Sequence, residues 1–407
     1  MDKIGKKIFK TLSYTGVAAA LSASTFIGAY EYEVCGPFNN LDNVGVPGWE
    51  CVGADAACTP FKLYGDFLWW KANEGGLELG REVVVERIHE QYEDEDLQKI
   101  LKGSKIKEPN FQFDPGFRIG MAYVFGDNCW DAQLEWTHFY TTSSVKGASC
   151  ILPDTQPYKR YVAFVPYWES LAQNFPDLAY ANWKLNLDLV DLEFGRKYFF
   201  SSAFAVRPQF GLRYARIDQK YHVKSSTERS DEFDFNGASY DYFSRVKARS
   251  EFSGVGPRAG FDADLNISCG FTLFGTAAGS LLFGKFDRHF HEHFKNHDEY
   301  YYQFDIFEDC AHDKGHCVTR ATTDLAIGIR WEHSFDCCQH LFPVAVALSW
   351  EHHAFYNFNN FNVNPDSFTN TNHESFDFGP YTNLLPGLQK QGDLYTQGLT
   401  LSFAVNF

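Results

Sequence analysis

Charged side chains of both signs recur at alternate positions in segments that are otherwise apolar. Arg118, for example, lies between Phe117 and Ile119. Alternate residues of a β-strand share one face, so a barrel built from such segments would carry these charges on its inner wall. The predicted inward-facing set is Lys62, Asp66, Arg118, Asp131, Glu135, Lys184, Asp188, Arg207, Arg213, Arg258, Asp262, Asp264, Arg330, Glu332 and Glu351.

Two kinds of chemistry are open to this set. The opposite charges can pair with one another and fill the lumen, or they can form the two walls of a constriction that orients permeating solutes. Increased conductance after Arg258→Ala would favour a filled lumen, because the substitution leaves the partner charge unpaired. Changed ion selectivity at unchanged conductance would favour a constriction.

A run of histidines offers a further kind of chemistry. The pattern His289-x-His291-x-His293 puts imidazoles on one face of a strand, and three more follow: His297, His312 and His316. Such imidazoles can bind a divalent metal. The spacing matches no defined zinc signature, and we predict neither a metal site nor a cofactor.

Catalytic motifs are not found in the sequence. It contains no nucleophile elbow, zinc-protease helix motif or Gly-rich phosphate loop. His352 and His353, with Asp366 farther along, come nearest to a catalytic group, and histidines occur at strand ends without catalysis. We predict no catalytic residues and no enzymatic activity.

The elements that must position the charges are strands with period-two alternation. Leu399, Leu401 and Phe403 alternate with small or polar residues near the C-terminus, and similar segments recur along the chain. We predict ten strands, with a bulge near Val190–Asp191 where the alternation changes phase. Segments 233–243 and 300–306 are candidates for additional strands. The predicted strands are 61–71, 115–125, 130–140, 183–190, 204–214, 255–267, 271–284, 325–332, 344–351 and 399–407.

Long and short connections alternate between these strands. This alternation is typical of outer-membrane barrels, which have short periplasmic turns and long extracellular loops. We therefore predict an all-β fold, a transmembrane antiparallel up-and-down β-barrel of about 10 strands within a range of 10 to 16. The 17% of aromatic residues suits the aromatic girdles of such barrels. A net charge of −16 argues against a nucleic-acid partner.

The chain divides into three predicted parts. Four lysines precede an apolar run from Val17 to Ile27, which indicates a Sec-type signal peptide over 1–29. A Cys-containing periplasmic segment, 30–60, precedes the barrel, 61–407. Within the barrel, 82–107 has helical character. The aromatic segment 158–175 is expected to fold inward as a constriction or to contact a neighbouring barrel.

Cysteines are predicted mainly on the periplasmic side. They lie before the first strand or in short turns: Cys35, Cys51, Cys58, Cys129, Cys269, Cys337 and Cys338. Intrachain disulfides and covalent links to neighbouring envelope proteins are both open. Cys310 and Cys317, with six residues between them, are candidates for closing a small loop.

Several motifs together resemble a known family. They are Leu63-Tyr64-Gly65-Asp66-Phe67-Leu68-Trp69-Trp70-Lys71, Gly116-Phe117-Arg118-Ile119-Gly120, Val206-Arg207-Pro208-Gln209-Phe210-Gly211-Leu212-Arg213, Gly254-Val255-Gly256-Pro257-Arg258-Ala259-Gly260 and Gly392-Asp393-Leu394. From about residue 61 to 407 the chain resembles the major outer membrane proteins of Legionella and the MOMP-like porins of environmental chlamydiae. The chlamydial porins are usually drawn with about sixteen strands, against the ten predicted here.

The resemblance implies an abundant, surface-exposed, pore-forming protein of the outer membrane, often linked through cysteines. The expected function is passive diffusion of small hydrophilic solutes together with a role in envelope structure. The alternative is a surface adhesin or structural barrel with a filled lumen that acts through its long loops. Expected partners are outer-membrane lipid, small hydrophilic solutes, other envelope proteins or a host surface, and further copies of the chain in a homo-oligomer.

Overall fold

The computed structural model describes residues 61–88, 97–125, 130–151, 159–167, 176–229, 240–268, 270–298, 303–337, 340–361 and 392–406. All of them belong to one compact unit, Pro47–Phe407, and the second unit, Met1–Val46, lies outside them. The predicted signal peptide and periplasmic segment therefore lie outside the described residues. Within the described ranges, no helix is long and apolar enough to cross a membrane.

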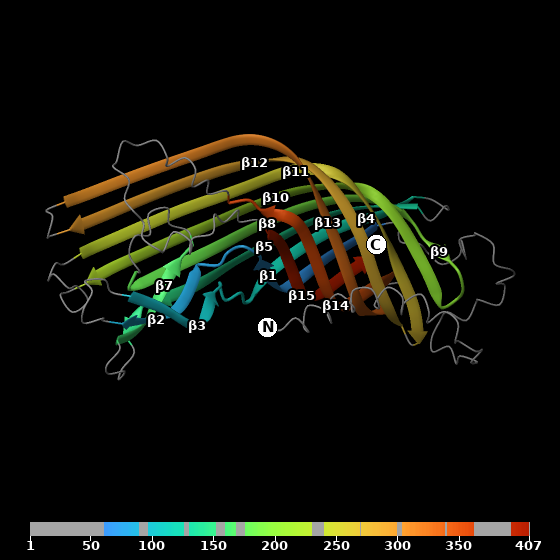
Figure 1. Cartoon of the computed structure of the whole chain (residues 1–407). Helices are drawn as coiled ribbons and strands as arrows, with labels where there is room; N and C mark the ends of the chain where they lie inside the picture. Colours follow the sequence, from blue (N-terminus) through green and yellow to red (C-terminus); the bar gives the residue numbers. More distant parts are fainter. Residues whose placement is uncertain are drawn as a thin grey trace. The chain divides into compact units, whose positions relative to one another are not determined.

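Ten antiparallel strands form a closed barrel (Figure 1). Pairing of β15 with β1 and of β10 with β11 completes the ring, and the predicted ten-stranded all-β barrel is confirmed. A two-residue strand, β9 (Tyr198–Phe199), pairs with the start of β10. Around the barrel the strands are β1 (Phe61–Glu74), β4 (Phe113–Phe125), β5 (Trp130–Ala148), β8 (Leu178–Arg196), β10 (Phe204–Arg229), β11 (Tyr240–Ser268), β12 (Phe271–Asp298), β13 (Gln303–Cys337), β14 (His340–Asn359) and β15 (Gly392–Asn406).

The two ends of the barrel differ. At one end, here called the turn end, short connections join β4 to β5, β11 to β12 and β13 to β14. At the other, the extended end, several strands continue far beyond what a membrane requires. A tilted transmembrane strand takes about 9–11 residues, whereas β10, β11, β12 and β13 have 26, 29, 28 and 35 residues.

These long strands correct two parts of the sequence prediction. The stretches between 214 and 255 and between 284 and 325, predicted as long connections, are mostly strand. The described parts of the candidate extra strands 233–243 and 300–306 belong to β11 and β13. They lengthen existing strands, because their partners are the extended ends of neighbouring strands in the same barrel.

The apolar side of the wall changes face along the strands. On β10, Phe210 and Leu212 point outward and are exposed, whereas Ile217 and Tyr221, nearer the extended end, point inward and are buried. The ladders that join β10 to β8 and β11 keep one register throughout, so no bulge causes the change. Near the turn end the apolar surroundings are expected to be hydrocarbon outside the wall. Near the extended end the apolar residues pack inside the barrel.

The same change explains a wrong prediction on β8. We predicted a bulge near Val190–Asp191, but β8 pairs with β5 and with β10 without any shift in register. Leu185, Leu187 and Leu189 face inward into the core near the extended end. The apolar residues nearer the turn end, such as Leu192, face outward and are exposed. One regular strand thus has apolar residues on both faces, at different heights.

A second, four-stranded sheet covers part of the inner wall. It consists of β3 (Leu97–Lys107), β2 (Gly80–Ile88), β7 (Lys159–Pro166) and β6 (Cys150–Ile151), in that order. The helical character predicted for 82–107 is wrong, because β2 and β3 form an antiparallel hairpin and β2 also pairs with β7. Pairing with β7, which is distant in sequence, outweighs the local preference for a helix.

Phe164 fixes this sheet to the barrel. Its side chain is fully buried in the hydrophobic core, and its backbone N–H donates to Ser149 Oγ at 3.0 Å. A Cβ atom on Gly147 of β5 would lie 2.2 Å from the Phe164 ring, so glycine is needed for this close approach. Of the two alternatives predicted for 158–175, Phe164 follows the inward one. Trp168 lies outside the described residues.

The last residues of β14 turn into the barrel. Asn357 has a positive φ of 57°, a conformation that asparagine tolerates better than most residues, and the β14–β15 register shifts between Phe355 and Asn359. This irregularity directs Phe358 against Phe252 of β11 and Phe286 of β12, with ring centroids 4.9 and 6.1 Å away. Together with Phe355, these aromatic side chains fill the barrel near its extended end, and we call them the aromatic filling.

Candidate functional site: the ion-pair lattice of the lumen

The inner wall nearer the turn end carries most of the predicted charges. Every member of the predicted set except Lys184 and Asp188 lies on the inward face of its strand, as the ion pairs below and the alternation of burial indicate. We call the connected group of inward-facing charged residues, predicted or not, the ion-pair lattice. It is built from residues on β1, β4, β5, β8, β10, β11, β13 and β14.

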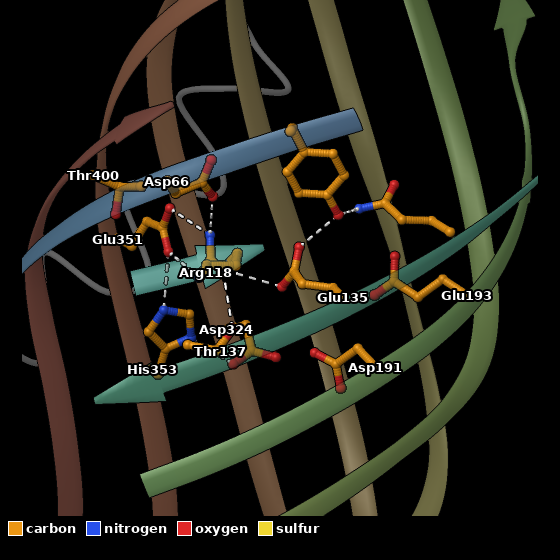
Figure 2. A network of polar contacts seen from close by, with 12 residues as sticks. Asp66, Arg118, Glu135, Thr137, Asp191, Glu193, Asp324, Glu351, His353 and Thr400 are labelled. Atoms are coloured by element: carbon orange, nitrogen blue, oxygen red, sulfur yellow. Dashed lines mark hydrogen bonds and ion pairs between the residues drawn. The ribbon is translucent and has the colours of Figure 1, made fainter. Parts of the chain in front are cut away.

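Arg118 of β4 is one centre of the lattice (Figure 2). Its Nη2 lies 2.7 Å from Glu351 Oε2, its Nη1 lies 3.2 Å from Asp66 Oδ2, and its Nε lies 3.1 Å from Glu135 Oε1. Nε also donates to Thr137 Oγ1 at 3.1 Å. The guanidinium thus joins carboxylates from β14, β1 and β5. All four charged side chains are largely buried, with exposed fractions between 5% and 18%.

Asp324 of β13 is the second centre. It accepts from Arg213 Nη1 at 2.8 Å and makes a close contact with Arg258 Nη1. Arg213 also binds Asp191 of β8 at 2.6 Å, and Arg258 binds Glu193 of β8 at 2.6 Å. Because β8 and β13 are separated by three other strands around the ring, these arginines connect opposite walls across the lumen.

His353 of β14 joins the two centres. Its Nδ1 lies 2.7 Å from Asp324 Oδ1 and its Nε2 lies 3.2 Å from Glu351 Oε2. Figure 2 shows its imidazole beside Glu351, below Arg118 in the view. The lattice is therefore continuous from Asp66 to Glu193.

Additional ion pairs lie nearer the turn end. Arg207 Nε binds Asp131 at 2.8 Å, and its Nη1 binds Asp262 at 2.9 Å. Asp264 accepts from Lys197 at 2.5 Å and lies 3.3 Å from Arg330. These pairs connect β10 with β5 and β11, and β11 with β13.

Trp70 separates the lattice from the aromatic filling. The Arg118 guanidinium lies over its ring at 5.5 Å, and the His353 ring lies 4.6 Å away. Trp70 also contacts Phe139 at 5.7 Å, and its Nε1 donates to Thr400 Oγ1 at 3.1 Å. Contacts with both a cationic group and aromatic rings suit the amphipathic indole.

Sequence reasoning missed four members of the lattice: Asp191, Glu193, Asp324 and His353. The two β8 carboxylates were missed because the alternation at the start of β8 assigned the even-numbered residues of that strand to the lumen. Asp324 shares the face of Arg330 in the alternation of β13, and this signal could have found it. His353 was considered only as a catalytic candidate, although it shares the face of Glu351.

Lys184 and Asp188 are not part of the lumen, and their predicted placement is wrong. Both lie on the outward face of β8, because the odd-numbered residues of that strand point inward. Asp188 Oδ1 instead lies 2.8 Å from His138 Nδ1 on the outside of β5. The His138 ring in turn contacts Phe117 at 5.3 Å.

The cysteine predictions are largely outside the described residues. Cys35, Cys51, Cys58, Cys129, Cys269 and Cys338 lie outside them, and the side chain of Cys337 is not described. Cys310 and Cys317 are both free and exposed. Their predicted loop is wrong, because both lie on the single extended strand β13, where seven residues span about 23 Å. A disulfide requires Cα atoms less than about 7 Å apart.

The lattice can hold the walls together, and its arrangement is poorly suited to moving charge. Each arginine is shared between two or three carboxylates, so displacing one of them leaves several buried charges unpaired. Within the described part of the chain, no lattice residue stands apart from these ion pairs as a candidate nucleophile or general base. Metal-ligand geometry occurs elsewhere, on the outer face, at Asp287, His289 and His312.

Similar solved structures include the outer membrane protease OmpT from Escherichia coli, with 11% identity over 86% of this chain and 98% of that chain and a TM-score of 0.33. The P. putida toluene transporter TodX has 6% identity over 86% and 91% of the two chains and a TM-score of 0.24. A Pseudomonas aeruginosa FadL homologue has 6% identity over 85% and 89%, with a TM-score of 0.24.

No curated protein matches the sequence at a significant level. The family described as Legionella pneumophila major outer membrane protein precursor matches residues 56–388. This match covers most of the barrel and agrees with the resemblance seen in the motifs. The chain therefore belongs to the Legionella major outer membrane protein family and is an outer-membrane β-barrel.

Proposed function

We propose that this protein is a sealed outer-membrane barrel whose longest strands, β10 to β13, continue above the membrane. We call this part of the barrel the extension, and we propose that the protein acts through it. The observation that carries the proposal is the pairing of Arg213 and Arg258 with carboxylates on opposite walls of the lumen. These pairs cross the path that a solute would take. Of the two functions expected from the sequence, the proposal corresponds to the surface adhesin or structural barrel with a filled lumen.

The aromatic filling adds a second barrier above the lattice. Gln219 of β10 donates to the Phe358 carbonyl at 3.5 Å, and Tyr221 of β10 donates to the Leu77 carbonyl at 2.9 Å. These bonds connect β10 to the end of β14 and to the segment that follows β1, on the opposite side of the ring. A hydrated ion would have to lose much of its hydration to pass side chains such as Phe252 and Phe358.

The strand number supports the same function. About eight strands enclose a lumen that side chains can fill, whereas 16 to 18 leave an aqueous channel. Ten strands are close to the lower limit. The proposed orientation has the turn end in the periplasm and the extended end outside the cell, as in other outer-membrane barrels.

Passive diffusion of small hydrophilic solutes is the second candidate. It is favoured by the presence of both signs of charge at one height, for example at Arg118 and Glu351. If the aromatic filling withdrew, these groups would line a narrow constriction. This function requires Phe355 and Phe358 to leave a core in which both are fully buried.

The proposal includes no catalysis. His353 and Asp324 have the residue types of a catalytic pair, but both are buried and bound within the lattice. Outer-membrane lipid is the proposed partner of the outward apolar residues, such as Phe67 and Ile327, which are 50% and 60% exposed. A host surface or another envelope protein is the proposed partner of the extension.

Liposome swelling with sugars of increasing size distinguishes the two candidates. We expect liposomes that contain the refolded protein to swell no faster than protein-free liposomes, even with the smallest sugar, because the lattice and the aromatic filling are both in place. The variant Phe355→Ala/Phe358→Ala removes part of the filling and leaves the lattice. Rapid swelling of the wild-type protein, graded by sugar size, would favour the diffusion pore.

A further inference from the structure

Two histidines and an aspartate meet on the outer face of β12 and β13. His289 and His312 are directly opposite each other in the ladder, with ring centroids 3.8 Å apart. Asp287 Oδ1 lies 2.9 Å from His312 Nε2 and 3.3 Å from His289 Nε2. The three potential ligand atoms all lie within 4.8 Å of one another. We call these three residues the outer histidine cluster.

An irregularity in β13 creates this arrangement. Phe286 is opposite His316 and Asp287 is opposite Lys314, so Gly315 is an extra residue in the ladder. Gly315 has a positive φ of 86°, which identifies a bulge of the type that uses a left-handed glycine. The extra residue reverses which residues of β13 face outward. His312 therefore shares the outer face with Asp287 and His289.

The cluster lies beyond the apolar band of the outer wall. Among the described side chains, Phe283 is the last strongly exposed apolar residue on β12 in this direction, at 56% exposure, and Lys285 follows it on the same face. The side chains of Asp287, His289 and His312 remain 40%, 47% and 38% exposed. Ions in the surrounding water can therefore reach all three.

We infer that the outer histidine cluster binds a divalent first-row transition ion such as Zn²⁺ or Ni²⁺. Two imidazole nitrogens and one carboxylate oxygen are a ligand set that these ions accept, with water in the remaining positions. Bonds of about 2.0–2.1 Å to a tetrahedral ion place neighbouring ligand atoms about 3.3 Å apart. The two distances from Asp287 Oδ1 are already near this value. Only the two imidazoles need to rotate, from a stacked arrangement to one that converges on the ion.

The neighbouring arginine binds carboxylates outside the cluster. Arg249 on β11 is opposite His289 in the ladder, but its guanidinium binds Asp218 and Glu251 at 2.9 Å each. Two residues farther along β12, His291 is opposite Cys310 of β13, with 2.8 Å between His291 Nδ1 and Cys310 Sγ. Cys310 lies on the same outer face as His312, so its contribution to binding must be tested separately.

Calorimetric titration of the refolded full-length protein with ZnCl₂, and separately with NiCl₂, tests the site. We expect saturable binding by the wild-type protein, and about tenfold or greater loss of affinity in Asp287→Asn and in His312→Gln. The matched control is His222→Gln, which removes an outward-facing histidine of β10 that lies outside the cluster, and its affinity should equal that of the wild type. Cys310→Ser should also retain binding.

Wild-type protein that does not bind either ion would overturn the inference. Equal affinities of Asp287→Asn, His312→Gln and the wild type would do the same, because binding would then occur elsewhere. If a ligand variant does not refold, modification of wild-type histidines by diethyl pyrocarbonate replaces it. Zn²⁺ should protect His289 and His312 in the peptide masses and leave His222 reactive. Failure of this protection also contradicts the site.

Discussion

Arg118 contacts carboxylates from three strands, and its removal should be costly. The substitution Arg118→Met leaves Glu351, Asp66 and Glu135 without their shared cation in a buried environment. Breaking a buried ion pair by removing one partner costs about 3–5 kcal/mol. We expect a loss of unfolding free energy of this size, measured by urea unfolding in detergent with tryptophan fluorescence.

Arg216→Met is the matched control. Arg216 also lies on a barrel strand and binds a carboxylate, Glu251, at 2.8 Å, but its side chain is 51% exposed. Exposed ion pairs contribute about 0–1 kcal/mol. Equal losses of stability in the two variants would contradict the structural role of the lattice.

The sequence predicted most residues of the lattice but not their connections. Arg118 and Glu351 alternate with lipid-facing apolar residues, and this alternation alone assigns them to the inner face. Asp191 could not be assigned in the same way, because apolar residues occupy both faces of β8 at different heights. The contact of Arg213 with Asp324 joins residues 111 positions apart, and no local pattern encodes such a contact.

At the scale of elements, the strands show why a period-two pattern alone does not identify which face of a strand points into the barrel. On β10 and β8 the apolar residues move from the outer to the inner face without any change in register. An apparent change of phase in the sequence therefore has two possible causes, a bulge or a change of surroundings. Gly315 and Asn357 mark true irregularities, and both have positive φ angles, which are not visible in hydrophobic periodicity.

At the scale of elements, Phe164 should determine whether the inner sheet stays docked. The substitution Phe164→Ala removes a fully buried ring from the core and leaves a cavity, at a cost of about 3–5 kcal/mol. We expect β2, β3 and β7 to become sensitive to a protease added to intact cells or proteoliposomes, with cleavage mapped by mass spectrometry.

The control for this prediction is Ile106→Ala on β3. Ile106 is an apolar residue of the same sheet, but it is 52% exposed, so its truncation should leave the cleavage pattern unchanged. Resistance of Phe164→Ala equal to that of Ile106→Ala would mean that the sheet is held by other contacts.

At the scale of the whole molecule, one closed wall serves two environments. Near the turn end the wall has exposed apolar residues outside and the ion-pair lattice inside. Near the extended end it has polar residues outside and an aromatic core inside, so the long strands carry their own core beyond the apolar band. The ten strands follow from the alternation in the sequence, whereas about sixteen, implied by the resemblance, would have enclosed a wider lumen.

The central claim is that the lumen is closed, and single-channel recording in planar bilayers tests it most directly. The refolded wild-type protein should insert without producing conductance steps, because Arg118, Arg213 and Arg258 bridge the walls below a packed aromatic core. The variant Arg258→Ala/Phe358→Ala, which weakens both barriers, should produce a measurable leak. Regular conductance steps from the wild-type protein, unchanged in this variant, would contradict a sealed barrel.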